Sequence, residues 1–235
     1  EAECLNAPYL KKVRTGKPWV IAKWAMTIDG RIATVGGESQ WITGQTARAD
    51  VHRLRGRMDA IAVGMGTVEA DDPMLTARPP GPRIATRVVF CRHRLPSIDS
   101  RLIQTANEFP LLLIVGQQIN ATDLRLLESH GAVTLHAHTD DATEMIETAL
   151  DAMGGQGMTN LMLEGGGELL ASFFAANQID ECHVHIGAKA FGGVQAPGPI
   201  GGPGLEKVND AWSFSLVSLN QFDDDLKAVY RKISD

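Results

Sequence analysis

Short apolar runs alternate with longer polar segments along most of the chain. The runs are rich in Val, Ile and Leu and are shorter than a typical helix, so each predicts a buried strand. The predicted strands cover residues 18–26, 59–65, 87–91, 111–115, 132–137 and 160–163.

Helical periodicity fills several of the segments between these runs. Apolar residues recur at helical spacing behind Thr43, which predicts a helix over 43–58 with Thr43 as its N-cap. Segments 121–131 and 141–155 open with Thr or Asp in a capping position and end in glycine, so both are predicted helices. Shorter helices are predicted within 66–73 and from Glu168 to Phe174. Strands that alternate with helices predict an α/β fold with a mostly parallel central sheet and helices on both faces.

The C-terminal part of the chain has a different pattern. Residues 181–193 alternate as a strand, 194–204 are a loop rich in Gly and Pro, and 212–221 with 224–232 predict a closing antiparallel hairpin. Residues 1–17 are polar and are predicted to be a linker or a peripheral arm. Nothing in the composition divides 18–235, so these residues are predicted to form one domain.

Composition narrows the classes of function. The chain has 235 residues, 44% hydrophobic and 21% charged, with a net charge of −6, which is typical of a soluble globular protein and disfavours nucleic-acid binding. Its three cysteines, Cys4, Cys91 and Cys182, form no paired or metal-binding motif. No apolar run is long enough to span a membrane and no signal peptide opens the chain, so a cytoplasmic protein without membrane partners is expected.

The segment "LMLEGGGELLASFF" (161–174) places three glycines between a predicted strand and a predicted helix. The N-terminus of a helix attracts anions, and glycines allow a phosphate to approach the backbone closely. The spacing fits neither the dinucleotide fingerprint nor the Walker pattern. The alternative is an ordinary tight turn between strand and helix.

Four segments together carry a resemblance to a known family. They are "KWAMTIDGRIAT", "GESQWITG", "ARADVHRLRGRMDAIAVGMGTVEADDPMLTAR" and "LEGGGELLASFF". In this order they resemble the pyrimidine reductase of riboflavin biosynthesis, which in many bacteria is the C-terminal half of a bifunctional deaminase/reductase. The resemblance implies a dihydrofolate-reductase-like fold, NADPH as hydride donor and 5-amino-6-(5-phosphoribosylamino)uracil as substrate. It also implies a homodimer, and it makes 1–17 a linker from an absent N-terminal zinc deaminase domain, with 18–235 as the reductase domain.

The resemblance also assigns roles to individual residues. The implied substrate-binding residues are Ser39, Arg55, Leu75, Arg78 and Glu164. Arginine suits the substrate's phosphate, whereas a lone arginine on a helix is usually a solvated surface charge. A glutamate at the end of a buried strand is costly to bury, which favours a functional role for Glu164. Lys23, on the first predicted strand, is the candidate catalytic residue, and Asp29 is interpreted as closing a turn.

The implied cofactor-binding residues surround the glycines and the ends of other strands. They are Ala25, Trp41, Thr67, Asp71, Arg92, Gly166, Gly167, Glu168, Leu169, Leu170, Ala171 and Ser172. Arg92 departs from the family pattern, which often has serine there. It is predicted either to pair with the 2′-phosphate of NADPH or to mark a lost contact.

Two other functions are left open by the sequence. One is reduction of the related 2,5-diamino substrate before deamination, and the other is nucleotide binding without catalysis. His183 and His185, like His136 and His138, alternate on predicted strands without a third ligand, so no metal site is expected.

Overall fold

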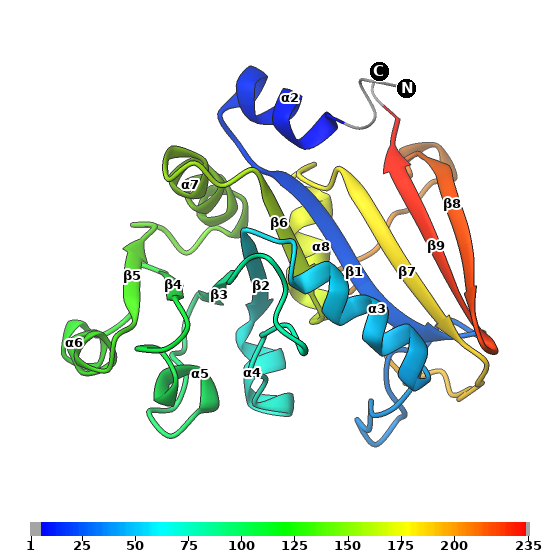
Figure 1. The fold of residues 1–235 in the computed structure, drawn as a ribbon, viewed down its shortest axis with the longest axis horizontal. Coiled ribbons are helices and arrows are strands. Elements are labelled where there is room, and N and C mark those ends of the chain that lie inside the picture. Colours follow the sequence, from blue (N-terminus) through cyan, green and yellow to red (C-terminus); the bar gives the residue numbers. More distant parts are fainter. Residues whose placement is uncertain (1–5, 234–235) are drawn as a thin grey trace. The chain divides into compact units, whose positions relative to one another are not determined.

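The computed structural model describes residues 6–233, and its internal contacts divide the chain into two compact units. The first unit comprises residues 1–19 and 52–162, and the second comprises residues 20–51 and 163–235. Figure 1 labels the elements of both units.

The first unit is built on a parallel arrangement of strands in the order β5-β4-β3-β2-β6. Neighbours from β2 to β5 pair in parallel. Val88, Val89, Leu113 and Ile114 are fully buried, as expected for parallel strands covered on both faces. The strands are β2 (Ala60–Gly64), β3 (Thr86–Cys91), β4 (Leu111–Val115), β5 (Val133–His136) and β6 (Asn160–Glu164), whose last two residues belong to the second unit.

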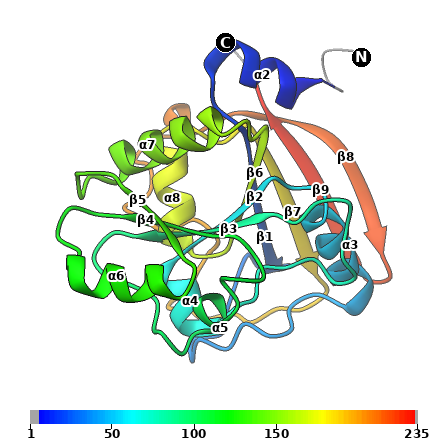
Figure 2. The ribbon, with the colours of Figure 1, turned by 60° about the vertical axis from the view of Figure 1, so that its left-hand side comes forward.

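Helices cover both faces of these strands, which confirms the prediction for this unit. Figure 2 shows α7 on one face and α4, α5 and α6 on the other. Their bounds are α4 (Met65–Asp71), α5 (Arg101–Gln104), α6 (Ala121–Ser129) and α7 (Ala142–Gly155). Asp141 accepts a hydrogen bond from the amide of Glu144 and so caps α7, as its position predicts. Helix α5 has only four residues, too few to show a helical period in the sequence.

The polar N-terminal segment contains a helix that the sequence did not predict. Helix α2 runs over Ala7–Thr15 and ends at Gly16, which has a left-handed conformation with φ 74°. The Lys12 ammonium donates a hydrogen bond to the carbonyl of Gly154, so α2 is fastened to the C-terminal end of α7. Residues 1–5 lie outside the described residues, and the linker role of 1–17 stays a prediction.

The second unit has the strand order β1-β7-β9-β8. β1 pairs with β7 in parallel, and β9 is antiparallel to both β7 and β8. The predicted closing hairpin is therefore confirmed. The strands are β1 (Trp19–Thr27), β7 (Glu181–Gly187), β8 (Phe214–Phe222) and β9 (Asp225–Lys232), and the helices are α3 (Gln45–Arg55), α8 (Gly167–Ala175) and the 3₁₀ turn η1 (Val208–Asp210). The first residue of β1 and residues 52–55 of α3 belong to the first unit.

Two predicted boundaries in this unit were wrong. The strand predicted over 181–193 ends at Gly187, because Asp29 and Lys189 hold the following residues in a loop rather than against a neighbouring strand. The helix predicted from Thr43 begins at Gln45, because the amide of Gly44 donates to the Asp225 carboxylate (2.6 Å). None of the helices within 6–233 combines the length and apolar character that crossing a bilayer requires.

Candidate functional site

The glycine turn between β6 and α8 needs glycine for two separate reasons. Gly165 and Gly166 have φ values of 71° and 77°, in the left-handed region that residues with a side chain rarely adopt. Gly167 has no such requirement, but a Cβ there would lie 3.2 Å from the amide nitrogen of Gly201. The loop that contains Gly201 thus approaches the turn closely, and its amide donates to the Gly167 carbonyl (3.0 Å). The phosphate-cradle role of the turn stays a prediction.

The remaining predicted cofactor residues on α8 divide by exposure. Glu168 is exposed, and Ala171 and Ser172 are half-buried. Leu169 and Leu170 are buried in the unit's core, so a cofactor would meet their backbone rather than their side chains. The buried Glu164 ends β6 directly before the glycine turn, so the predicted substrate carboxylate and the turn are adjacent in the chain.

Trp41 lies in the loop between β1 and α3 and has an exposed side chain. The Arg48 guanidinium sits over its indole ring, 4.4 Å from the centroid, an attractive cation–π contact. The Lys189 ammonium donates to the Trp41 carbonyl (2.5 Å). Ser39, in the same loop, is half-buried. The backbone of Trp41 is therefore anchored, and its ring is exposed although Arg48 lies over it.

Lys23 and Ala25 lie on β1 beside two buried histidines of β7. In the strand register, Lys23 faces His183 and Ala25 faces His185. His183 Nε2 lies 2.7 Å from Glu181 Oε1. Burial alone would raise the pKa of Glu181, but hydrogen bonds from His183 and Arg231 outweigh it and lower that pKa.

His185 is 1% exposed and neither ring nitrogen has a hydrogen-bond partner. Its Nε2 lies 3.6 Å from Asp50 Oδ2, too far for a hydrogen bond, and that carboxylate is bonded to Lys227 Nζ at 2.7 Å. Burial, with the nearby charges of Lys23 and Lys227, lowers the pKa of His185. Both His183 and His185 are therefore core residues.

The predicted residues of the first unit gather around the end of α3 and the loop that follows α4. Arg55 Nη1 donates to the Thr76 carbonyl (3.2 Å), and the amide of Arg78 donates to His52 Nδ1 (3.2 Å). Leu75, between them, is buried. These contacts bring Arg55, Leu75 and Arg78 together as predicted substrate residues within the first unit.

The predicted cofactor residues of the first unit follow the carboxyl ends of two parallel strands. Thr67 and Asp71 lie on α4 directly after β2, and Arg92 follows β3 with an exposed side chain. The carboxyl ends of parallel strands are where open α/β sheets bind ligands. Among residues 6–233, no three His, Cys, Asp or Glu side chains are grouped to hold a metal ion.

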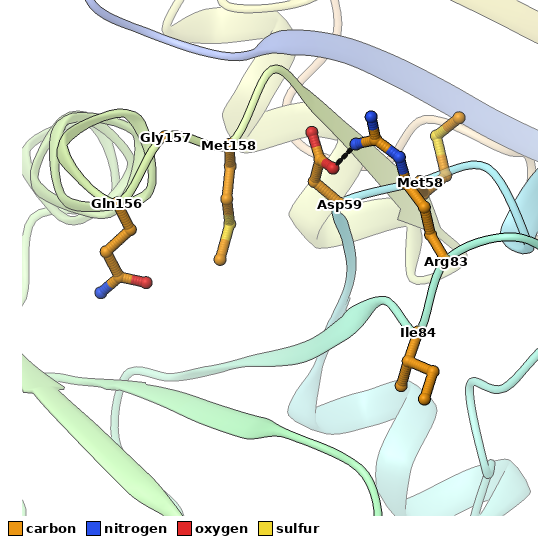
Figure 3. Close-up of a pocket in the computed structure, with 7 residues that line it drawn as sticks. All are labelled: Met58, Asp59, Arg83, Ile84, Gln156, Gly157 and Met158. Carbon is orange, nitrogen blue, oxygen red and sulfur yellow. Dashed lines mark ion pairs between the residues drawn. The ribbon is translucent and has the colours of Figure 1, made fainter.

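A pocket of about 380 Å³ lies at the opposite, amino ends of β2 and β6 and contains none of the predicted site residues. Asp59 and Arg83 pair within it, while Met158 and Ile84 supply apolar walls (Figure 3). Asp59 Oδ2 also accepts from the amide and hydroxyl of Thr159, both at 2.7 Å. The Asp59 carboxylate thus joins the amino ends of β2 and β6, so its role in this pocket is structural.

Sequence reasoning missed the contacts that the loop after β7 makes. Residues 188–204 are bonded to Asp29, Arg31 and Gly167, and none of these links was predicted. Asp29 was interpreted as closing a turn, and the structure shows it accepting from Thr27 and from the amides of Phe191 and Gly192. The Asp-Gly pair marked a turn, but no local pattern indicates a contact between residues 163 positions apart in the chain.

Comparison with known proteins agrees with these observations. The model of the RibD C-terminal domain matches residues 18–228. The riboflavin biosynthesis protein RibD of Actinobacillus pleuropneumoniae is 34% identical over 237 residues, covering 100% of this chain and 62% of that protein. The chain thus spans less than two thirds of that relative's length.

Solved structures give the same relationship. Acinetobacter baumannii RibD superposes with a TM-score of 0.83 at 26% identity, covering 99% of this chain and 63% of that one. Dihydrofolate reductase from Enterococcus faecalis, complexed with NADP(H), superposes with a TM-score of 0.50 at 13% identity, covering 92% of this chain and 97% of that one. The second likeness concerns the fold alone and agrees with the predicted dihydrofolate-reductase-like architecture.

Proposed function

Because the chain belongs to the RibD C-terminal domain family, we propose that it reduces 5-amino-6-(5-phosphoribosylamino)uracil with NADPH in riboflavin biosynthesis. The observation that carries the proposal is the family match over 18–228, which includes every residue assigned to substrate or cofactor. The match to RibD of A. pleuropneumoniae along the whole chain supports the same pathway.

The reaction depends on the orientation of the reacting groups more than on acid–base catalysis. The bond from C1′ to the ring oxygen breaks, that oxygen takes a proton, and a C1′=N bond forms as the nitrogen gives up its own proton. Bound NADPH supplies the hydride that C1′ accepts, and the nitrogen takes a second proton. Lys23, half-buried on β1, is placed in this scheme beside the sugar, where its ammonium can donate a proton to the departing oxygen. Holding the reacting atoms in line supplies much of the barrier reduction.

The protein offers groups that suit a phosphorylated sugar and a dinucleotide. Arg55 and Arg78 lie together and can bind the substrate's phosphate. Gly166 has φ 77° and no side chain at the start of α8, which leaves room for the pyrophosphate of NADPH. Trp41 presents an exposed ring that can cover the cofactor, and the exposed Arg92 suits its 2′-phosphate.

The proposal extends to the protein's partners and location. A homodimer is proposed, supported by the exposed apolar side chains of β8, an edge strand of the second unit. Fusion to a zinc deaminase domain is proposed because the chain covers 62% of its A. pleuropneumoniae relative. A cytoplasmic location is proposed for a pathway that uses soluble metabolites.

The experiment compares two substrates and two hydride donors. We expect loss of NADPH absorbance with the deaminated uracil substrate, and a kcat/KM at least about tenfold lower with the 2,5-diamino substrate or with NADH. Turnover of the diamino substrate instead would establish the first alternative. NADPH binding without turnover of either substrate would leave a non-catalytic nucleotide-binding module.

A further inference from the structure

Residues 188–204, which we call the strap, form a loop that is bonded along its length to other parts of the second unit. The amide of Ile28 donates to the Lys189 carbonyl (2.8 Å), and the amide of Ile32 donates to the Pro197 carbonyl (3.0 Å). Arg31 Nη1 donates to the Ala196 carbonyl (2.8 Å). The strap and the loop after β1 therefore form one connected layer beyond the carboxyl ends of β1 and β7.

Asp29 is the most heavily used anchor of the strap. Its Oδ1 accepts from the hydroxyl of Thr27 (2.5 Å) and from the amide of Phe191 (3.2 Å), and its Oδ2 accepts from the amide of Gly192 (2.7 Å). The bond from Thr27, followed by that from Gly192, lowers the pKa of Asp29 to about 2. An ionised carboxylate accepts on both oxygens more strongly than a protonated one, so the charge of Asp29 strengthens the anchor.

The two ends of the strap reach two groups that the proposed function assigns to NADPH. Near its start, Lys189 Nζ holds the Trp41 carbonyl (2.5 Å). Near its end, the amide of Gly201 donates to the Gly167 carbonyl (3.0 Å). A Cβ at Gly201 would lie 2.7 Å from Glu168 Oε1, so this end is packed against the start of α8 without a gap. One loop thus connects Trp41, which is proposed to cover a ring of the cofactor, with the turn at Gly167, which is proposed to bind its phosphates.

We propose that Asp29 is a positioning residue for NADPH, which acts by holding the strap and, through it, Trp41 and the turn at Gly167. The inference rests on the proposed function, in which these two groups bind the cofactor. Asp29 is separated from both groups by the strap, so its effect on binding is indirect. Because a preorganised site loses less entropy when a ligand binds, loosening the strap weakens NADPH binding.

The test is Asp29→Asn, whose amide nitrogen cannot accept the second backbone hydrogen bond. We expect the NADPH dissociation constant, measured by fluorescence titration, to rise about fivefold, less than the loss of a charged hydrogen bond within the site itself would cause, because the effect of Asp29 is indirect. Hydrogen exchange without ligand should quicken at the amides of Phe191, Gly192 and Gly201. Asp224→Asn, an exposed aspartate in the turn between β8 and β9, removes the same charge and should change neither quantity.

Lys189→Met is a second variant that cuts only the link to Trp41. It should weaken NADPH about threefold, as expected for one exposed hydrogen bond, without quickening exchange at Gly192. If Asp29→Asn speeds exchange at Gly192 and Gly201 while its NADPH affinity equals that of the parent, the strap is structural only and the inference is wrong. Failure of the unaltered protein to bind NADPH is a separate result, which would remove the proposed function and the inference together.

Discussion

Arg87, on β3, is a fully buried cation whose partners are neutral oxygen atoms. Its Nη1 donates to the hydroxyl of Thr105 (2.8 Å), and its Nη2 donates to the carbonyls of Phe109 (2.7 Å) and Leu102 (3.2 Å). Burial lowers the pKa of Arg87 to about 10, which still leaves the side chain charged at neutral pH. The guanidinium thereby fastens α5 and the residues that follow it to the sheet.

Replacing this arginine should cost much more than replacing an exposed one. Arg87→Met keeps the apolar stem but leaves buried carbonyls without donors, so we expect a loss of about 2–4 kcal/mol in the free energy of unfolding. Arg57→Met, at an exposed position, should change it by less than about 0.5 kcal/mol. Urea unfolding of both variants provides the comparison. Equal effects would mean that the buried bonds contribute nothing net.

The burial of His185 predicts that the stability of the protein depends on pH. The groups that face it are Asp50 on α3, Lys23 on β1, Lys227 on β9 and His183 on its own strand. Because burial lowers the folded-state pKa below 6.5, the unfolded chain binds more protons than the folded one as pH falls through 6.5. Stability contributed by the neutral imidazole is thus present above this pH and is lost below it, at up to about 1.4 kcal/mol per pH unit.

The test compares unfolding free energies at pH 7 and pH 5.5 in His185→Asn and in the parent. We expect the variant to lose less stability on acidification, whereas His93→Asn, at an exposed position, should behave like the parent. The lowered pKa of Glu181 does not interfere, because its effect is confined to pH values below about 4.5. An unchanged pH slope in His185→Asn would show that this histidine titrates normally.

At the scale of elements, the turn between β6 and α8 offers a matched pair of glycines. Gly165 and Gly166 have nearly equal φ values, 71° and 77°, so an added methyl group strains the backbone to a similar degree at either position. Only Gly166 is assigned to the cofactor. We therefore expect Gly166→Ala to weaken NADPH binding at least about tenfold, or about 1.4 kcal/mol, and Gly165→Ala to weaken it much less.

Fluorescence titration with NADPH measures this difference once both variants have been shown to unfold at similar temperatures. Substrate affinity, assigned mainly to Arg55, Arg78 and Glu164, should fall less in Gly166→Ala. If the two alanine variants bind NADPH equally well, the turn is required by the backbone alone and is no phosphate cradle.

The elements that the sequence predicted well are those that local pattern determines. Strands β2, β3, β4 and β6 were identified from continuous apolar runs. A run that is apolar throughout and too short for a helix is typical of a strand buried on both faces. Helices α6 and α7 were recognised as helices, but only the predicted cap of α7 was right, because α6 is capped by Asn120 rather than by the threonine that follows it. Helix α2 was missed because its polar composition resembles a linker and its fastening comes from Lys12 and a distant carbonyl.

At the scale of the whole molecule, the candidate site was named through resemblance rather than through pattern. Short motifs gave the order of Lys23, Arg55 and the glycine turn along the chain. In the structure, Arg55 belongs to the first unit, whereas Lys23 and the glycine turn belong to the second. The strap escaped prediction because each of its bonds uses at least one backbone group and joins loops that are remote in the sequence, so no local residue pattern indicates them. Side-chain chemistry can be read from a sequence, whereas a role carried by backbone contacts becomes visible only in the fold.

The proposed homodimer gives the last prediction at this scale. Strand β8 lies at an edge of the second unit, and its Leu216 and Leu219 are 57% and 58% exposed. An edge strand that exposes large apolar side chains is a surface expected to pair with another chain. We expect the double change Leu216→Lys and Leu219→Lys to yield a folded monomer, because two buried charges on each side of a symmetric interface would be unpaired.

Sedimentation of the parent and the variant at the same concentration measures the change. Val133→Lys provides the matched control, since Val133 is 60% exposed on β5, an edge strand of the first unit, and its substitution should leave the parent's mass unchanged. A parent that sediments as a monomer would refute the homodimer itself. A lysine variant that remains dimeric would place the interface away from β8, since an apolar contact cannot retain its affinity after two charges are buried in it.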